Sequence, residues 1–201
     1  MSSPEKRAYF DSIADKWDGW EDLVALPGRL REGLSALGVR PGETVIDLGC
    51  GTGNLTAVLV EMVGERGCVI GVDFSPVMLA RAQTKLSLPR VRWLCEEAHR
   101  LSVDAQSVDR VVCFSAWPHF DEPLRVAGEI FRLLKPGGHA HIWHLAGREV
   151  INEVHCGQGE PIGRDWLPPA VEVAQLLRDV GFLIERIVDE TKSYLVSVIR
   201  P

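Results

Sequence analysis

The 201-residue chain contains no run of about 18 apolar residues, and its opening residues, MSSPEKRAYFDS, contain no apolar core of signal-peptide length. We therefore expect neither a membrane span nor export, and we predict a cytoplasmic protein. The chain also lacks a basic cluster, since 22 Lys and Arg stand against 28 Asp and Glu, for a formal net charge of −6. Nucleic-acid binding needs clustered cations, so the sequence predicts a small-molecule partner and no nucleic acid.

Cysteine is sparse, and no Cys-x-x-Cys pair occurs among the five residues. This pattern predicts thiols in a reducing compartment rather than a disulfide framework. Histidines gather late in the chain, at His139, His141, His144 and His155, beside Cys156. On a strand His139 and His141 would face one side and His144 the other, so they do not converge and we predict no metal site.

Strand-like and helix-like segments alternate along the chain, whose 46% hydrophobic and 25% charged residues are typical of one globular domain. This order predicts an α/β fold with right-handed crossovers and a mostly parallel sheet covered by helices on both faces. Only a few residues around 190–192 join the last two strands, which is too short for a parallel crossover, so the last strand is predicted to be antiparallel. The expected strands are 44–48, 69–72, 91–94, 108–114, 139–145, 183–189 and 194–199, and the expected helices are 4–17, 27–37, 54–63, 76–86, 122–134 and 170–180.

The strongest motif is Asp47-Leu48-Gly49-Cys50-Gly51-Thr52-Gly53-Asn54, where an apolar strand runs through three glycines into a helix. Glycines there let the backbone turn sharply and approach a ligand closely. A dinucleotide fingerprint would place its third glycine at position 54, which is Asn. Asp47 would repel a pyrophosphate and would suit a ligand end that carries an ammonium or a sulfonium.

Two acids follow later strands. Asp73 ends the second strand, where it could accept both hydroxyl protons of an adenosine ribose. Its alternative role is a helix N-cap, but Ser75 fits the cap better and leaves Asp73 for the ligand. Glu97 follows the third strand and could accept from an adenine amino group, although such an acid is commonly only a solvated surface residue.

These motifs, in this order, resemble the class I S-adenosylmethionine-dependent methyltransferases, and most closely their ubiquinone and menaquinone methyltransferase branch. The resemblance implies a Rossmann-like seven-stranded sheet, S-adenosylmethionine as cofactor and a small-molecule methyl acceptor. It implies a helical cap over residues 1–40 and a cofactor-binding domain over 41–201, in one domain overall. The cofactor-binding residues that it implies are Asp47, Gly49, Cys50, Gly51, Asn54, Asp73, Phe74, Ser75, Met78, Glu97, Ala98, Phe114 and Ser115.

The acceptor side is less defined. The Pro-Pro-aromatic motif of adenine and glutamine-amide methyltransferases is missing after the fourth strand, where Trp117-Pro118-His119 stands. His119 is the candidate catalytic residue, although it could merely end the strand. The aromatic N-terminal helix is either a cap over the cofactor or a helix packed on the sheet edge. The expected acceptor pocket consists of Phe10, Trp17, Trp117, His119, Asn152 and His155.

Residues 146–168 show no clear period, and we expect a lid that shapes the acceptor pocket, with a surface insertion as the alternative. Two other functions stay open besides methyl transfer. One is an oxidoreductase on a related dinucleotide fold, which the glycine spacing disfavours. The other is a cofactor-binding protein without transfer activity.

Overall fold

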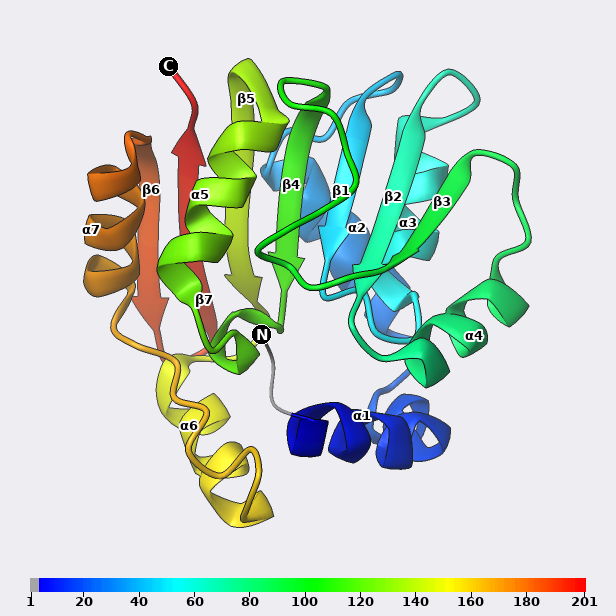
Figure 1. The fold of residues 1–201 in the computed structure, drawn as a ribbon, viewed down its shortest axis with the longest axis vertical. Coiled ribbons are helices and arrows are strands. Elements are labelled where there is room, and N and C mark those ends of the chain that lie inside the picture. The colour runs from blue at the N-terminus through cyan, green and yellow to red at the C-terminus, as the bar shows by residue number, and fades with distance from the viewer. Residues whose placement is uncertain (1–3) are drawn as a thin grey trace.

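The computed structural model describes residues 4–201, so residues 1–3 of the predicted cap lie outside the described part. Its centre is a seven-stranded sheet in the order β3-β2-β1-β4-β5-β7-β6 (Figure 1). β1 to β5 pair in parallel, whereas β7 is antiparallel to both β5 and β6. The predicted mostly parallel sheet with an antiparallel last strand is confirmed. The strands are β1 (Thr44–Leu48), β2 (Cys68–Asp73), β3 (Val91–Cys95), β4 (Val108–Phe114), β5 (Leu134–His144), β6 (Leu183–Glu190) and β7 (Ser193–Ile199).

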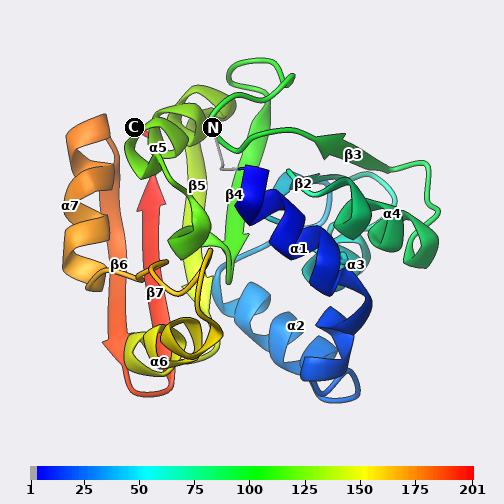
Figure 2. The same cartoon turned by 60° about the horizontal axis from the view of Figure 1, so that its bottom comes forward.

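Helices cover both faces of the sheet and one of its ends. In Figure 1, α5 and α7 lie in front of the sheet and α2 and α3 behind it, while α1 and α6 lie at its lower end (Figures 1 and 2). The helices are α1 (Pro4–Trp17), α2 (Leu26–Ala36), α3 (Asn54–Val63), α4 (Pro76–Lys85), α5 (Pro123–Leu133), α6 (Arg148–Gln158) and α7 (Ala170–Val180), with 3₁₀ turns η1 (Asp18–Trp20) and η2 (Trp117–His119).

The two faces of the sheet bury two separate cores, because neighbouring residues of a strand point to opposite sides. Val45 of β1 packs with Leu30 of α2 and Leu59 of α3. Its neighbour Ile46 faces the other way and shares a core with Ile130 of α5. Each fully buried side chain of this kind contributes roughly 1.5–3 kcal/mol to stability, so both helix layers hold the sheet in place.

The two helices of the predicted cap have different roles. α2 is part of the rear layer, since Leu30 and Leu34 are fully buried there. It packs so tightly that a Cβ on Gly33 would lie 2.3 Å from Cζ2 of Trp143 in β5. α1 instead lies across the end of the sheet. The division of the chain near residue 40 stays a prediction.

Residues 146–168 differ from the prediction, because α6 occupies the first half of the segment. The expected loop was wrong because α6 has no apolar stripe: Asn152 is its only buried residue. Asn152 anchors Leu167 in the loop between α6 and α7: its Nδ2 donates to the Leu167 carbonyl (3.1 Å) and its Oδ1 accepts from the Leu167 N–H (2.8 Å). Asn152 is therefore a structural residue of this segment.

The fifth strand also begins earlier than predicted. β5 pairs Leu134 with Val108, and the pairing then shifts so that His139 lies opposite Arg110. Pro136-Gly137-Gly138 thus forms an irregularity inside the strand rather than a turn before it, and Gly137 takes a φ of +78°. The other predicted helices and strands occur with ends that differ by at most a residue.

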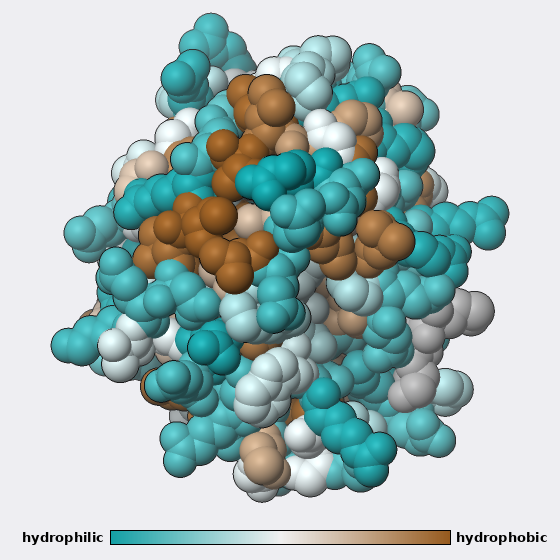
Figure 3. Space-filling model, turned by 90° about the vertical axis from the view of Figure 1, so that its left-hand side faces the viewer, coloured by the Kyte–Doolittle hydropathy of each residue, from teal (hydrophilic) through white to brown (hydrophobic). Residues whose placement is uncertain are grey.

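One of the two edge strands of the sheet is β6, with α7 beside it. Val171, Leu183 and Ile187 are exposed there, on the side of the molecule that Figure 3 presents with apolar residues in brown. Within residues 4–201, none of the helices combines the length and the apolar character that a membrane crossing requires.

Replacing Asn152 by Ala should lower the free energy of unfolding by about 2 kcal/mol, because it leaves the buried Leu167 N–H without its acceptor. Urea denaturation followed by circular dichroism measures this change. Glu153→Ala is the control, since its exposed neighbour position should change stability by less than about 0.5 kcal/mol. Equal stabilities for the two variants would contradict the structural role of Asn152.

Candidate cofactor and acceptor site

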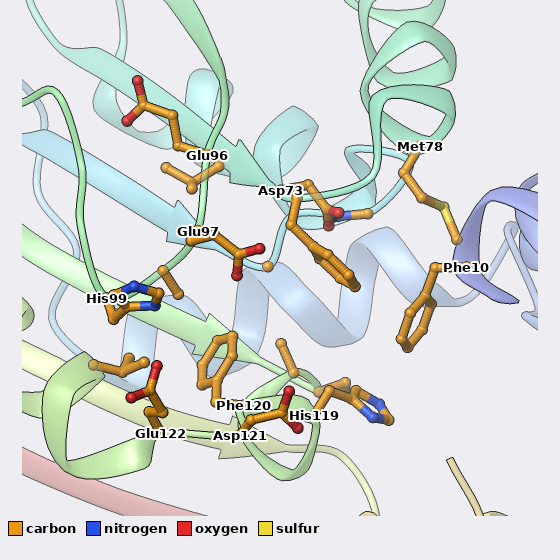
Figure 4. Close-up of a pocket in the computed structure, with 18 of the residues that line it drawn as sticks. Phe10, Asp73, Met78, Glu96, Glu97, His99, His119, Phe120, Asp121 and Glu122 are labelled. Carbon is orange, nitrogen blue, oxygen red and sulfur yellow. Dashed lines mark hydrogen bonds between the residues drawn. The ribbon is translucent and has the colours of Figure 1, made fainter. Parts of the chain in front are cut away.

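A cavity opens at the carboxyl ends of β1, β2, β3 and β4. Open α/β sheets place their ligands at this edge. Figure 4 shows the carboxylates of Asp73 and Glu97 pointing into it, with Phe10 and His119 at its far side. The lining residues are Phe10, Trp17, Gly49, Gly51, Val72, Asp73, Phe74, Met78, Glu96, Glu97, Ala98, His99, Ser115, Ala116, His119, Phe120, Asp121, Glu122 and Val126.

The glycine loop between β1 and α3 forms the floor of this cavity. Gly49, Gly51 and Gly53 all take positive φ, at +79°, +52° and +82°. A Cβ on Gly49 would lie 2.4 Å from the Cβ of Ala116, so no larger residue fits there. At Gly51 the nearest atom would be Nε1 of Trp17, 3.7 Å away. The loop therefore presents bare backbone to the cavity, as the sequence predicted for a close ligand approach.

Asp73 stands at the end of β2 and is almost fully buried. Its Oδ2 accepts from the Gly51 N–H (2.8 Å) and its Oδ1 from the Ser75 N–H (2.9 Å). As expected, the Ser75 hydroxyl caps α4 by accepting from the Met78 N–H. Asp73 is nevertheless not wholly free for a ligand, because both of its oxygens accept hydrogen bonds from backbone N–H groups. Each oxygen keeps a lone pair for a hydroxyl. Burial raises the pKa of Asp73 to about 6, against the effect of these N–H groups.

Asp47 does not line the cavity. Its side chain lies under the glycine loop, on the α3 side of β1, where Oδ2 accepts from the Thr56 hydroxyl (2.5 Å). Burial raises its pKa to about 7, and the nearby Asp73 carboxylate adds to this shift. Asp47 is therefore not positioned for the predicted direct contact with a cationic ligand end. Its hydrogen bond with Thr56 instead connects β1 to α3 beneath the glycine loop.

Four other predicted cofactor residues also lie outside the cavity lining, and one of them is Ser75, whose buried hydroxyl caps α4. The Cys50 side chain is buried behind the loop, with Sγ 3.3 Å from where a Cβ of Gly71 would stand. Asn54 bonds Asp18 and Lys85 and so joins η1 to α4. Phe114 packs against Trp143 on the rear face of the sheet, with ring centroids 4.9 Å apart. Gly49, Gly51, Asp73, Phe74, Met78, Glu97, Ala98 and Ser115 do line the cavity.

The wall after β3 contains Glu97, which is not a free surface acid. Its Oε1 meets the Arg7 Nη2 from α1 at 3.2 Å, and Arg7 lies 5.9 Å from the centroid of the Phe74 ring. Arg7, His99 and Phe120 were not predicted from the sequence, because none of them belongs to a motif. Only the folded chain brings α1 against the loop that follows β3.

Aromatic side chains of α1 close the cavity. Phe10 packs edge-on against Phe74 (5.7 Å), Trp17 (6.1 Å) and His119 (5.0 Å). It shares a small core with Met78 and Ile162. Of the two roles considered for this helix, α1 thus has the position of a cap; that it closes over a bound cofactor stays a proposal.

A second, apolar groove separates α1 from α6 and shares Phe10, Trp17 and His119 with the cavity. Of the predicted acceptor residues, these three and His155 lie there. Trp117 does not, because it is buried in the front core with its ring against Phe120 (5.8 Å). The other lining residues are Tyr9, Ile13, Trp20, Val154, Gln158 and Ile162.

A buried polar cluster links α1, η2 and the segment after α6. His119 Nδ1 lies 2.7 Å from Oδ2 of Asp165, whose Oδ1 is 2.8 Å from the Lys6 Nζ. Lys6 also contacts Asp121 Oδ1 (2.6 Å) and the His119 carbonyl (3.1 Å). Burial opposes ionisation of Asp165, but the hydrogen bonds from His119 and Lys6 outweigh it and lower its pKa. Neither Lys6 nor Asp165 was predicted from the sequence to contribute to the site.

The late histidines take separate positions. His139 and His141 stack on one face of the sheet at 6.2 Å, and His144 packs against Tyr194 on the other. His141 lies 2.6 Å from Nη1 of the buried Arg110. Within residues 4–201 no three His, Cys, Asp or Glu side chains group as metal ligands would.

A glycine loop after the first strand, with an acid at the end of the second, defines a Rossmann-like site for an adenosine-containing cofactor. Residues 45–138 match a family model described as a methyltransferase domain. The chain thus contains a methyltransferase domain and shares its fold with S-adenosylmethionine-dependent methyltransferases.

Curated relatives include the chloroplastic 2-phytyl-1,4-beta-naphthoquinone methyltransferase of Arabidopsis thaliana, 35% identical over 150 residues, and a demethylmenaquinone methyltransferase of Bacillus cereus, 32% identical over 146 residues. The alignments cover 70% and 69% of this chain but only 57% and 62% of those proteins. A solved S-adenosylmethionine-dependent methyltransferase from Aquifex aeolicus is 25% identical and superimposes with a TM-score of 0.78, covering 95% of this chain and 98% of its own.

The cavity suits S-adenosylmethionine, the cofactor of this family. The loop leaves no room for side chains at Gly49, and Asp73 retains lone pairs for ribose hydroxyls. Five carboxylates line the cavity, whereas no lysine or arginine is among the described residues that line it. Three of these carboxylates, Glu97, Asp121 and Glu122, pair with cations from outside the lining, but no cation among the described residues faces the cavity to receive a pyrophosphate.

Removing the Asp73 carboxylate should weaken binding of S-adenosylhomocysteine at least tenfold, because charge-assisted hydrogen bonds contribute on the order of 1.5–3 kcal/mol each. Calorimetry on Asp73→Ala measures this loss. Asp73→Asn keeps an oxygen for one backbone N–H and separates loop damage from lost ribose contacts. Wild-type affinity in both variants would place the ribose elsewhere.

The buried Asp47 carboxylate should make stability depend on pH. Its pKa is about 7 in the folded state and about 3.9 in the unfolded chain, so between these values the folded state binds more protons. The free energy of unfolding therefore falls as pH rises through this window. Asp47→Asn should stabilise the protein more at pH 8 than at pH 5, as measured by urea denaturation. The same gain at both pH values would refute a raised pKa.

Proposed function

We propose that the protein transfers a methyl group from S-adenosylmethionine to a small, largely apolar acceptor that enters through the groove between α1 and α6. One observation carries this proposal: the groove and the cofactor cavity meet at Phe10, Trp17 and His119. An acceptor in the groove can therefore reach the cavity without displacing the ribose-binding carboxylate of Asp73. Such a juxtaposition of two ligands is what a direct transfer needs.

The chain's own residues would hold the cofactor as follows. Backbone at Gly49 and Gly51 leaves room for its amino-acid end, and Asp73 accepts from the ribose hydroxyls. Phe74 and Ala98 pack against the adenine. S-adenosylmethionine, when bound, supplies a methyl carbon already activated by a positive sulfur. Because that activation lies in the cofactor, the protein mainly has to align the acceptor, exclude water and remove a proton.

The lining of the groove indicates the class of acceptor. Tyr9, Trp17 and Trp20 provide flat apolar surfaces, while no Asp, Glu, Lys or Arg is among the described residues that line the groove. A neutral aromatic ring system matches this surface better than a charged amine or a carboxylate. The names of the two curated relatives, a naphthoquinone and a demethylmenaquinone methyltransferase, support a ring of this kind.

Nucleic acid is a poor candidate acceptor for this surface. The net charge of −6 and the carboxylates at the cavity oppose phosphate contacts. The five cysteines are all free thiols in the structure, which supports a reducing compartment such as the cytoplasm.

The test is transfer of tritiated methyl from S-adenosylmethionine to a panel of reduced naphthoquinones, phenols, thiols, DNA and RNA. We expect incorporation into a ring compound. Val154→Asp places a charge in the groove and should raise the acceptor KM about tenfold, a loss of about 1.4 kcal/mol, with unchanged affinity for S-adenosylhomocysteine. Val150→Asp, one turn away on α6 and outside the groove, is the matched control. Incorporation into nucleic acid, or into nothing on the panel, would contradict the proposal.

A further inference from the structure

The two ring nitrogens of His119 have different surroundings. Nδ1 faces Oδ2 of Asp165 at 2.7 Å, in a pair of which only about a tenth of each side chain is exposed. Within residues 4–201, no hydrogen-bond partner meets Nε2, although His119 lines both the cavity and the groove. The ring packs against two others, Phe10 at 5.0 Å and His155 at 4.8 Å between centroids. The imidazole is therefore fixed in orientation with one nitrogen left for a ligand.

Asp165 determines which nitrogen carries the proton. Its Oδ1 forms an ion pair with the Lys6 Nζ at 2.8 Å, and the same Nζ lies 2.6 Å from Oδ1 of Asp121. Lys6 and Asp165 are both nearly buried, so this ion pair is weakly screened. The pKa of Asp165 is lowered and it stays a carboxylate, which only accepts hydrogen bonds. His119 therefore donates from Nδ1, and in the neutral form of the ring this places the lone pair on Nε2.

We propose that His119 is the general base of the reaction, that Asp165 is its positioning residue, and that the acceptor carries a weakly acidic hydroxyl. The inference rests on the proposed function, since it concerns the junction where the acceptor meets the cofactor cavity. A thiolate or a preformed carbanion would need no such base. A phenol-like or hydroquinone-like hydroxyl does, because its proton must leave as the oxygen, or a ring carbon that shares its electrons, attacks the methyl carbon.

The step balances as follows. The acceptor O–H bond breaks, its proton goes to His119 Nε2, and its electron pair remains on the acceptor. That pair forms the new bond to the methyl carbon, while the bond between carbon and sulfur breaks with its pair left on sulfur. The imidazolium is stabilised by the Asp165 carboxylate and returns its proton to water through the open groove. No oxidant or other reactant is needed.

The surroundings of His119 leave this role to it rather than to its neighbour. His155 donates from Nδ1 to the Asp165 carbonyl (2.6 Å), and burial lowers its pKa. Burial lowers the pKa of His144 to about 3, so this ring is neutral. The charged and titratable groups that face His119 are Lys6 from α1, Asp121 beside η2, Asp165, His155 from α6 and His144 from β5.

The first test does not depend on activity. In the full-length protein labelled with ¹⁵N-histidine, long-range proton–nitrogen spectra should show His119 as the Nδ1–H tautomer at neutral pH. Asp165→Asn should abolish this preference. Asp121→Asn is the matched control, since it also removes a carboxylate from Lys6 but leaves the Asp165 contact, and should keep the tautomer. An Nε2–H tautomer in the wild type would overturn the proposal, even if the variants fail to fold.

The second test uses 1,4-dihydroxynaphthalene as the hydroxyl acceptor. His119→Gln and Asp165→Asn should each lower kcat by roughly a hundredfold at pH 7, with unchanged affinity for S-adenosylhomocysteine. The defects should shrink as pH rises, because the hydroxyl then ionises without a base. The double variant should be no worse than either single one. Normal kcat in both variants would contradict the assignment of His119 as the base and leave the proposed function intact. No turnover of any panel compound by the wild type would contradict the proposed function. The tautomer of His119 would then be the test of how Asp165 positions the ring.

Discussion

The hydrogen bond from the Gly51 N–H to the Asp73 carboxylate ties the glycine loop to the end of the neighbouring strand, and much of the site depends on it. The loop cannot carry side chains where Gly49 meets Ala116, so its backbone must be held by outside partners. Gly49 and Cys50 donate to the Val72 carbonyl, one residue before Asp73. The loop is thus locked to β2, and α3 begins in a fixed direction from Gly53. Ligand recognition and chain reversal use the same few atoms.

The other half of the site is assembled by one cation. Lys6 comes from α1, Asp121 from the connection before α5 and Asp165 from the segment after α6. These three side chains meet, with Lys6 and Asp165 buried and Asp121 exposed to water. A buried ion pair repays its desolvation only when its geometry is good and its remaining donors are used. Lys6 also donates to the His119 carbonyl, which meets this condition and fixes η2. The aromatic face of α1 is thereby held across the cavity by polar contacts at one end and by Phe10 at its centre.

Much of the fold could be predicted from the sequence because its signals are local. Proline and glycine mark helix ends, and short β-branched apolar runs mark the strands. Because side chains alternate between the two faces of a strand, Asp47 falls with Val45, and Phe114 with Val112, on the α3 side of the sheet rather than at the ligand. Asp47 and Phe114 were nevertheless predicted to bind the cofactor, because the motif resemblance implied it. α6 and Asp165 could not be found, because α6 lacks an apolar stripe and Asp165 gains its role only from Lys6, which lies far away in the sequence.

The buried acids at the end of the sheet, Asp47 and Asp73, lower the stability of the ligand-free protein and favour binding of a cation. Burial raises the pKa of Asp47 to about 7 and that of Asp73 to about 6, so each resists ionisation in the protein without its ligand. A cationic cofactor placed above the loop favours the ionised forms, and the free energy that folding loses to these carboxylates then contributes to binding. This links the choice of cofactor to the fold itself. An anionic pyrophosphate in the same place would add to the repulsion that Asp47 and Asp73 already exert on each other, which is why this glycine loop suits a sulfonium nucleoside rather than a dinucleotide.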